Sequence, residues 1–89
     1  MHRSLTQEIE ERLQVYEPIE LTLKDQSALH AGHQGNQGGG HFALKIVSSR
    51  FSNKTQVIRH RMIYQALNDL IPQRIHAISI LAISPDDSI

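Results

Sequence analysis

The chain has 89 residues, with nine Lys and Arg against nine Asp and Glu, a formal net charge of zero, and no Cys. A chain of this length buries roughly 60% of the surface that its unfolded form exposes, which supports one small core and disfavours an independent enzyme with a deep cavity. The lack of Cys excludes disulfides, thiolate nucleophiles and sulfur ligands from this chain, and the balanced charge argues against a dedicated nucleic-acid binder.

Residues 4–16 predict an amphipathic helix. Ser4 and Gln7 have the spacing of a capping box, and the residue before Pro18 is pushed out of the helical region, which ends the segment. The apolar residues form one stripe at helical spacing: Leu5, Ile9, Leu13 and Tyr16. We therefore expect a helix whose stripe faces a core.

Two segments with alternating apolar and polar residues predict strands at residues 19–25 and 41–48. The apolar face of the first is Ile19, Leu21 and Leu23, and that of the second is Phe42, Leu44 and Ile46. Because the two strands follow one another, we expect an antiparallel pair. A long flexible loop, Gln26–Gly40, joins them.

A second helix is predicted over residues 55–71. Asn53 tolerates the left-handed conformation in the turn before it, and either Asn53 or Thr55 supplies the cap. Pro72 ends the helix. A helical wheel centred on Ile63 places the following residues on its core side: His60, Ala66, Leu67 and Leu70.

Residues 75–83, IHAISILAI, are rich in Ile and lie between Pro72 and Pro85, which predicts a strand. A helical crossover joins it to the preceding strand, so the two are expected to be parallel. The result is a single α+β domain with a three-stranded mixed sheet and helices on one face, followed by a polar tail at residues 84–89. The N-terminus shows no signal peptide and no apolar run approaches the roughly 20 residues of a membrane helix. We expect a soluble intracellular protein, in the cytoplasm or a eukaryotic organelle.

The segment HAGHQGNQGGGHF, residues 30–42, holds three of the six His and all five Gly. It is either a flexible linker or a metal-binding loop, because imidazole is a common neutral metal ligand and Gly lets the backbone turn a ligand inward. His30 and His33 are close in sequence, and His41 stands at the entrance of the strand. Their spacing matches no standard zinc pattern, so both interpretations stay open.

His76 stands near the start of the last predicted strand, on a rigid element. If that strand alternates regularly, His76 shares a face with Ile78 and Ile80 and is a half-buried histidine of structural type. The other interpretation is that His76 is a fixed metal ligand. His60, on the apolar stripe of its helix, is expected to pack in the core.

A candidate partner surface lies on the second predicted helix. Ile58 and Met62 are i, i+4 neighbours on the face opposite the core stripe. Arg59 and Arg61 stand beside them. Exposed apolar residues next to Arg are typical of a protein interface, whereas the alternative is a solvated basic helix face.

Three blocks of the sequence resemble the BolA family: HFALKIVSSRF, VIRHRMIYQALNDLI and IHAISILAISP. The resemblance covers about residues 4–85, and the HAGH segment fits it. It implies an α-β-β-α-α-β fold akin to a class II KH domain. The chain departs from the family pattern at Asn53, where Gly is common, and at Thr55, where Ser is common. It also carries GGGHF where many members have acidic and Ser residues, so the match of the loop histidine to His30 or to His33 stays open.

The resemblance implies that the chain binds a monothiol glutaredoxin of the CGFS type and shares a [2Fe–2S] cluster with it. The resemblance implies that this chain supplies His76 and a loop histidine, His30 or His33. Iron–sulfur clusters are normally held by thiolates, so a chain without Cys needs sulfur from the partner and its glutathione. Imidazole must be deprotonated to bind, and ligation is expected to weaken near or below about pH 6.5. The docking face would include Ile58, Arg59, Arg61 and Met62.

Alone, the chain is expected to be a monomer or a weak homodimer without cofactor. Family members are also described as transcriptional regulators that contact DNA through the KH-like helical region. The RHR cluster favours this alternative, and the neutral charge and the sequence SNKT in place of a G-x-x-G clamp oppose it. A metal chelator that acts without a partner is a third possibility. No nucleophile with a matching base is visible, so we expect no enzyme.

Overall fold

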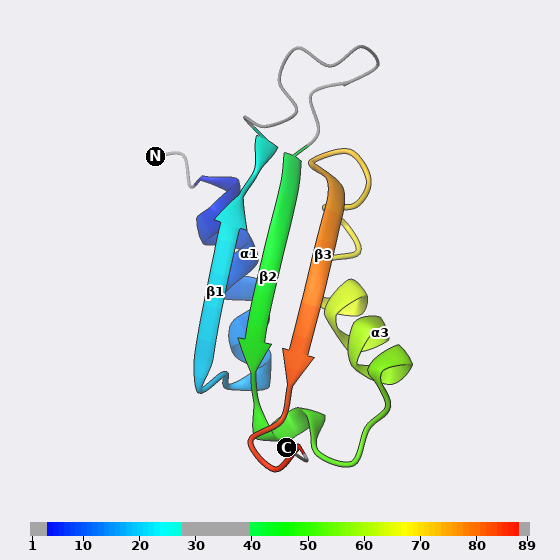
Figure 1. Ribbon diagram of the computed structural model, residues 1–89. Helices are drawn as coiled ribbons and strands as arrows, with labels where there is room; N and C mark the ends of the chain where they lie inside the picture. The colour runs from blue at the N-terminus through cyan, green and yellow to red at the C-terminus, as the bar shows by residue number, and fades with distance from the viewer. Residues whose placement is uncertain (1–3, 28–39, 88–89) are drawn as a thin grey trace.

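The computed structural model describes residues 4–27 and 40–87. Its elements in chain order are α1 (Leu5–Leu13), the 3-10 helix η1 (Gln14–Tyr16), β1 (Glu20–Asp25), β2 (Gly40–Val47), the 3-10 helix η2 (Ser49–Phe51), α3 (Gln56–Ala66) and β3 (Ile75–Ile83). The sheet order is β1-β2-β3, with β1 antiparallel and β3 parallel to β2 (Figure 1). The predicted α+β fold with a three-stranded mixed sheet is confirmed.

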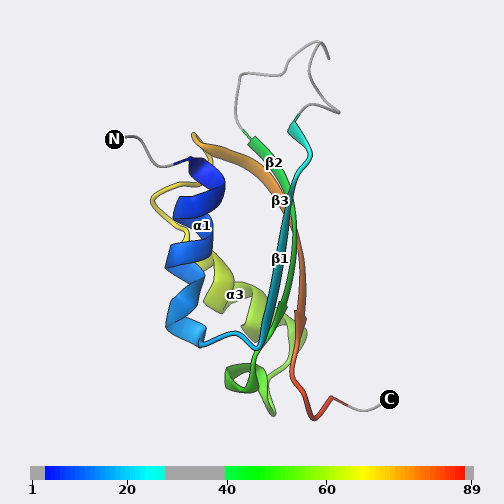
Figure 2. The same ribbon diagram turned by 90° about the vertical axis from the view of Figure 1, so that its left-hand side faces the viewer.

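The helices lie on one face of the sheet, and the described residues leave the other face uncovered (Figure 2). The core between helices and sheet consists of Ile9, Leu13, Phe42, Leu44, Ile46, Phe51, Ile63, Leu67, Leu70, Ile75 and Ala82. Apolar side chains from both layers meet there because each helix and the sheet has one apolar face to bury. No helix in the described part of the chain combines the length and apolarity needed to cross a membrane.

The capping box at the start of α1 forms as predicted. The Ser4 hydroxyl accepts a hydrogen bond from the Gln7 backbone N–H, and the Gln7 side chain accepts one from the Ser4 backbone N–H, both at 3.1 Å. These bonds satisfy two donors that the first turn leaves open. The predicted helix is α-helical only to Leu13 and continues as η1. It ends at Glu17, whose positive φ of 48° redirects the chain into β1.

The start of α3 is also confirmed, but its end is not. Thr55 caps the helix by accepting the Ile58 N–H at 3.2 Å, after Asn53 has taken a left-handed φ of 62°. The helix ends at Ala66 rather than at residue 71. Beyond it, the Leu70 carbonyl accepts N–H groups from Arg74 and Ile75, both at 2.9 Å. This turn keeps Leu70 in the core while it brings the chain back to the sheet.

The strand faces follow the predicted alternation in β1 and β2. Phe42, Leu44 and Ile46 are buried, and Leu21 and Leu23 are half-buried against the core. Ile19 was expected on the same face, but it precedes β1 and is 68% exposed. Alternation in β3 is interrupted near its start, and this irregularity places His76.

Candidate functional site

His76 lies at a β-bulge near the start of β3. Gly40 pairs with Ile75, but the next residue of β2, His41, pairs with Ala77, so His76 is the extra residue of β3. A bulge redirects the side chain at the extra position. The expectation that His76 shares a face with Ile78 and Ile80 is therefore wrong: both Ile pack against the core, whereas His76 is exposed.

Two imidazoles meet beside this bulge. The ring centroids of His41 and His76 are 5.1 Å apart, with 42° between the ring planes. The His41 backbone N–H donates to the Ser27 hydroxyl at 3.0 Å, which ties the start of β2 to the residues that follow β1. Parallel strands start at the same end of a sheet, and this pairing brings the first residues of β2 and β3 together.

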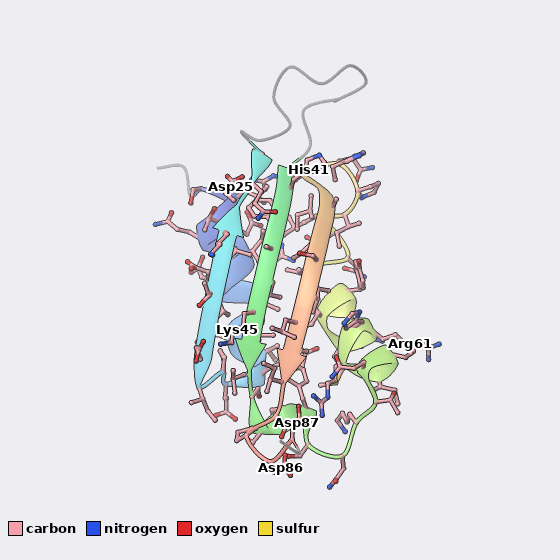
Figure 3. The ribbon with its side chains drawn as sticks, in the orientation of Figure 1. Asp25, His41, Lys45, Arg61, Asp86 and Asp87 are labelled. Carbon is pink, nitrogen blue, oxygen red and sulfur yellow. The ribbon has the colours of Figure 1, made fainter. Side chains whose placement is uncertain are left out.

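The same end of the sheet carries a carboxylate at the end of β1. Asp25 accepts the Ser27 backbone N–H at 2.9 Å, and hydrogen bonding from Ser27 holds the pKa of Asp25 below its ordinary value. Figure 3 shows Asp25 and His41 at this end, with Asp86 and Asp87 at the opposite one. His30 and His33 lie outside the described residues. Among residues 4–27 and 40–87, no group of three or more His, Asp or Glu is placed to hold a metal ion.

Arg59 does not belong to an exposed surface, contrary to the sequence-based expectation. It is 4% exposed. Its guanidinium donates to both carboxylate oxygens of Asp87 at 2.8 Å and to the Ala82 carbonyl at 3.0 Å. Arg59 stands four residues before Ile63 and therefore on the core side of the helix, and its burial there depends on the partners that Asp87 and Ala82 supply.

Met62 is likewise not freely exposed. Its side chain is half-buried against the core, and its carbonyl accepts the Tyr16 hydroxyl at 2.6 Å. Of the predicted surface set, Ile58, which is 44% exposed, and Arg61 lie on the outside of α3. Two exposed apolar residues that the sequence reading missed lie on the same helix: Val57, 62% exposed, and Tyr64, 42% exposed. The docking role of this surface stays a prediction.

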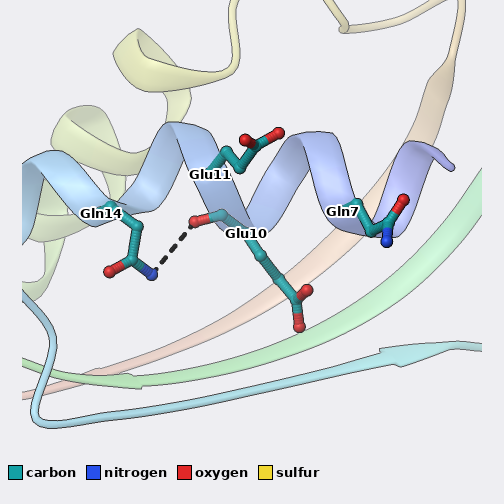
Figure 4. Close-up of a pocket in the computed structure, with 4 residues that line it drawn as sticks. All are labelled: Gln7, Glu10, Glu11 and Gln14. Atoms are coloured by element: carbon teal, nitrogen blue, oxygen red, sulfur yellow. Dashed lines mark hydrogen bonds between the residues drawn. The ribbon is translucent and has the colours of Figure 1, made fainter. Parts of the chain in front are cut away.

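Hollows near these residues are small or shallow. One of about 60 Å³ adjoins His76 and is lined in part by Tyr64 and Ile71. Another of about 260 Å³ lies on the open face of the sheet, over Ala43 and Leu81. A polar groove of about 340 Å³ runs along α1 and is lined by Gln7, Glu10, Glu11 and Gln14 (Figure 4).

Comparisons with known proteins agree with this architecture. The profile of the family described as BolA-like protein matches residues 9–87. The chain is 41% identical over 76 residues to the chloroplastic protein BOLA1 of Arabidopsis thaliana, covering 81% of this chain and 48% of that protein. It is 44% identical over 75 residues to the chloroplastic/mitochondrial SufE-like protein 1 of the same plant, covering 78% of this chain and 20% of that protein. The chain thus spans about half and about a fifth of these two relatives.

A bacterial relative and two solved structures are also similar to this chain. The DNA-binding transcriptional regulator BolA of Haemophilus influenzae is 35% identical over 85 residues, covering 94% of this chain and 81% of that protein. BolA1 from Arabidopsis thaliana superimposes with a TM-score of 0.84 at 36% identity, over all of both chains. The BolA domain of SufE1 from the same plant gives 0.82 at 40% identity, over 99% of this chain and all of that one. The chain belongs to the BolA-like family.

Proposed function

We propose that this chain binds a monothiol glutaredoxin and completes a shared [2Fe–2S] cluster through His76 and a histidine of the segment after β1, His30 or His33. The observation that carries the proposal is the exposed His76 at a bulge, with the His41 ring 5.1 Å away. A bulge holds the backbone of a rigid strand while it turns the extra side chain outward. His76 is therefore accessible to a partner, and the pairing of β3 with β2 fixes the backbone that carries it.

The donor set of this chain fits a share of such a cluster and not a whole one. Clusters of this type are held by thiolates, with His in place of Cys at some positions. The chain has six His and no Cys, so the sulfur ligands come from the glutaredoxin and its glutathione. When bound, the cluster supplies one-electron redox chemistry and transferable iron and sulfide. The chain's own part is to present neutral imidazole nitrogen and to set the partner's orientation.

The placement of Ser27 and Gly40, which flank residues 28–39, is compatible with a second ligand from that segment. These residues connect Ser27 to Gly40. The backbone N–H of His41 donates a hydrogen bond to the Ser27 hydroxyl at 3.0 Å. Both ends of the segment therefore lie beside the strand end that carries His76.

The first prediction concerns His76→Ala in a complex reconstituted with a monothiol glutaredoxin and glutathione without oxygen. We expect the iron retained after desalting to fall roughly tenfold or more, and the visible circular dichroism to change, because a metal ligand is lost. His60→Gln, on α3 and outside the site, is the matched control. A spectrum and iron content equal to those of the unsubstituted complex would exclude His76 as a ligand.

A second measurement separates ligation from docking. Binding of the same variants to glutaredoxin without iron is measured by titration calorimetry. We expect His76→Ala to bind the iron-free partner nearly as well as the unsubstituted chain. Arg61→Glu, on the outside of α3, is expected to weaken this binding. If both variants bind normally, the docking part of the proposal is wrong.

A nucleic-acid function is the second candidate, because the Haemophilus relative is named a DNA-binding transcriptional regulator. Arg61 is exposed on α3, but the burial of Arg59 removes one cation from this surface. Gel shifts over a salt series test the candidate, since phosphate contacts make affinity fall steeply with salt. Binding that is absent at low salt would reject it.

We also propose that the chain is not an enzyme and acts in the cytoplasm or in a eukaryotic organelle. The names of the two plant relatives place them in chloroplasts or mitochondria. Imaging of the tagged protein tests the location.

A further inference from the structure

The outer edge of β1 carries backbone groups that the sheet does not use. β1 is an edge strand in the order β1-β2-β3 (Figure 1). The N–H of Gln26 donates to the His41 carbonyl at 2.7 Å, and these two residues extend the register in which Asp25 opposes Phe42. Bonding residues alternate along an antiparallel strand. Glu20, Thr22 and Lys24 therefore bond inward to β2, and the N–H and C=O groups of Leu21 and Leu23 point outward.

The side chains of this edge are complementary to a second copy of themselves. In an antiparallel pair centred on Thr22, Leu21 opposes the partner's Leu23, and the outward groups of these two residues form a hydrogen-bonded pair. The same register places Glu20 opposite the partner's Lys24, twice by symmetry. Opposite charges in direct cross-strand pairs are attractive.

Other registers lose this match. A shift by one residue would place the outward N–H and C=O groups of one β1 strand opposite residues of the other whose groups point inward. Only shifts by two residues therefore keep the hydrogen bonds between the two strands. A shift by two places Lys24 opposite Thr22 in one direction and Glu20 opposite Thr22 in the other, and both charge pairs disappear. Charged side chains on an edge strand usually prevent pairing with another strand. Here the negative charge of Glu20 and the positive charge of Lys24 attract each other in one register of self-pairing.

Neighbouring contacts are compatible with this pairing. Glu20 already lies 3.0 Å from the Lys45 ammonium of β2, so the partner's Lys24 would extend this to a row of alternating charges across the open face. Leu21 and Leu23 are only half-buried at the margin of the core, and the partner's leucines would cover them. Figure 4 shows the side chains of Gln7, Glu10 and Gln14 on the side of α1 turned towards β1, along the groove of about 340 Å³, so polar side chains lie next to this edge.

We propose that the β1 edge is a self-association surface, through which two copies of this chain pair antiparallel around Thr22 into one six-stranded sheet. The contact consists of one pair of strands, and the helix surfaces next to it are polar. We therefore expect the dimer to be weak and reversible. β1 and β3 are opposite edges of the sheet, so the dimer leaves His76 of each copy accessible. The proposal does not depend on the proposed function.

A single cysteine tests the register, because the chain has no other. The two Thr22 residues form a non-hydrogen-bonded pair with Cα atoms about 4.5 Å apart, which is within the range of a disulfide. We expect Thr22→Cys in a glutathione redox buffer to form a disulfide-linked dimer at least tenfold faster than Ser79→Cys, an exposed control on β3. Equal rates for the two folded variants would overturn the proposal.

Charge exchange tests the same surface without a covalent bond. We expect Lys24→Glu to weaken dimerisation roughly tenfold in sedimentation equilibrium, since two attractive cross-strand pairs become repulsive. Glu20→Lys should do the same, and a mixture of the two variants should form a mixed dimer. Lys54→Glu, an exposed lysine before α3 and away from the β1 edge, is the matched control. An unsubstituted chain that stays monomeric at millimolar concentration, or a mixture no more associated than either variant alone, would contradict the pairing.

Discussion

Among the ion pairs of the described residues, the pair between Arg59 and Asp87 is the most buried. The Arg59 side chain is 5% exposed and that of Asp87 is 35% exposed, with 2.8 Å between them. Asp87 also accepts the Ser84 backbone N–H at 3.0 Å. These bonds attach the residues after β3 to α3. The C-terminal segment that the sequence describes as a polar tail is thus part of the fold as far as Asp87.

Hydrogen bonding from Arg59 lowers the pKa of Asp87 to about 2. A carboxyl whose pKa is lower in the folded state stabilises the fold above its unfolded pKa of about 4, and this contribution is lost as the pH falls from about 4 to about 2. We therefore expect Asp87→Asn to lower the urea midpoint at pH 7. The difference from the unsubstituted chain should shrink over that acid range.

Urea titrations at pH 7, 4 and 2 measure this effect. Glu20→Gln is the control, because its ion pair with Lys45 is exposed and exposed pairs contribute little. If the difference between Asp87→Asn and the unsubstituted chain is the same at all three pH values, the ion pair does not stabilise the fold.

At the scale of elements, both helix starts follow from short-range spacing, whereas the end of α3 depends on distant contacts. The caps at Ser4 and Thr55 involve partners three residues away. In contrast, α3 stops at Ala66 because the chain must turn towards β3, and Ala66 itself offers its carbonyl to Arg12 of α1 at 3.4 Å. Arg12 also binds Asp69, which lowers the pKa of Asp69. The helix end is thus part of the contact between the two helices.

The cap of α3 gives a prediction at this scale. Thr55→Ala removes the oxygen that accepts the Ile58 N–H, and we expect it to lower the free energy of unfolding by about 1 kcal/mol. Thr55→Ser keeps this oxygen and should leave stability within a few tenths of a kcal/mol. Chemical denaturation of the three proteins measures both. A loss of similar size in Thr55→Ser would show that the methyl group, not the cap, matters.

At the scale of the whole molecule, one core holds two helices against one face of the sheet, and the other face is uncovered within the described residues. Ile63 of α3 is fully buried in this core. Exposed apolar side chains are found on the outside of α3 and on the open face, where Leu81 is 54% exposed. The apolar side chains on these two surfaces lie outside the core and are accessible to other molecules.

The core gives the corresponding stability prediction. Ile63→Ala should lower the free energy of unfolding by about 2–5 kcal/mol, because truncation of a buried side chain loses contacts and leaves a cavity. Val57→Ala, on the exposed side of the same helix, should change it by less than about 0.5 kcal/mol. Urea unfolding at neutral pH measures both. Equal losses would mean that Ile63 is not a core residue.

The sequence alone determined which side chains the chain can offer to a ligand and most of the elements. Alternation predicted β1 and β2, cap spacing predicted both helix starts, and the lack of Cys excluded thiolate ligands from this chain. These are properties of neighbouring residues or of the residue inventory, so they can be read without a fold.

Only the tertiary structure decided how His76 and Arg59 are placed. The bulge that turns His76 outward exists because β3 changes register against β2, a strand more than 30 positions earlier in the chain. Arg59 is buried because Asp87 reaches it from the other end of β3. Such contacts join segments that are far apart in sequence, and a pattern of neighbouring residues carries no record of which distant group will face a given side chain.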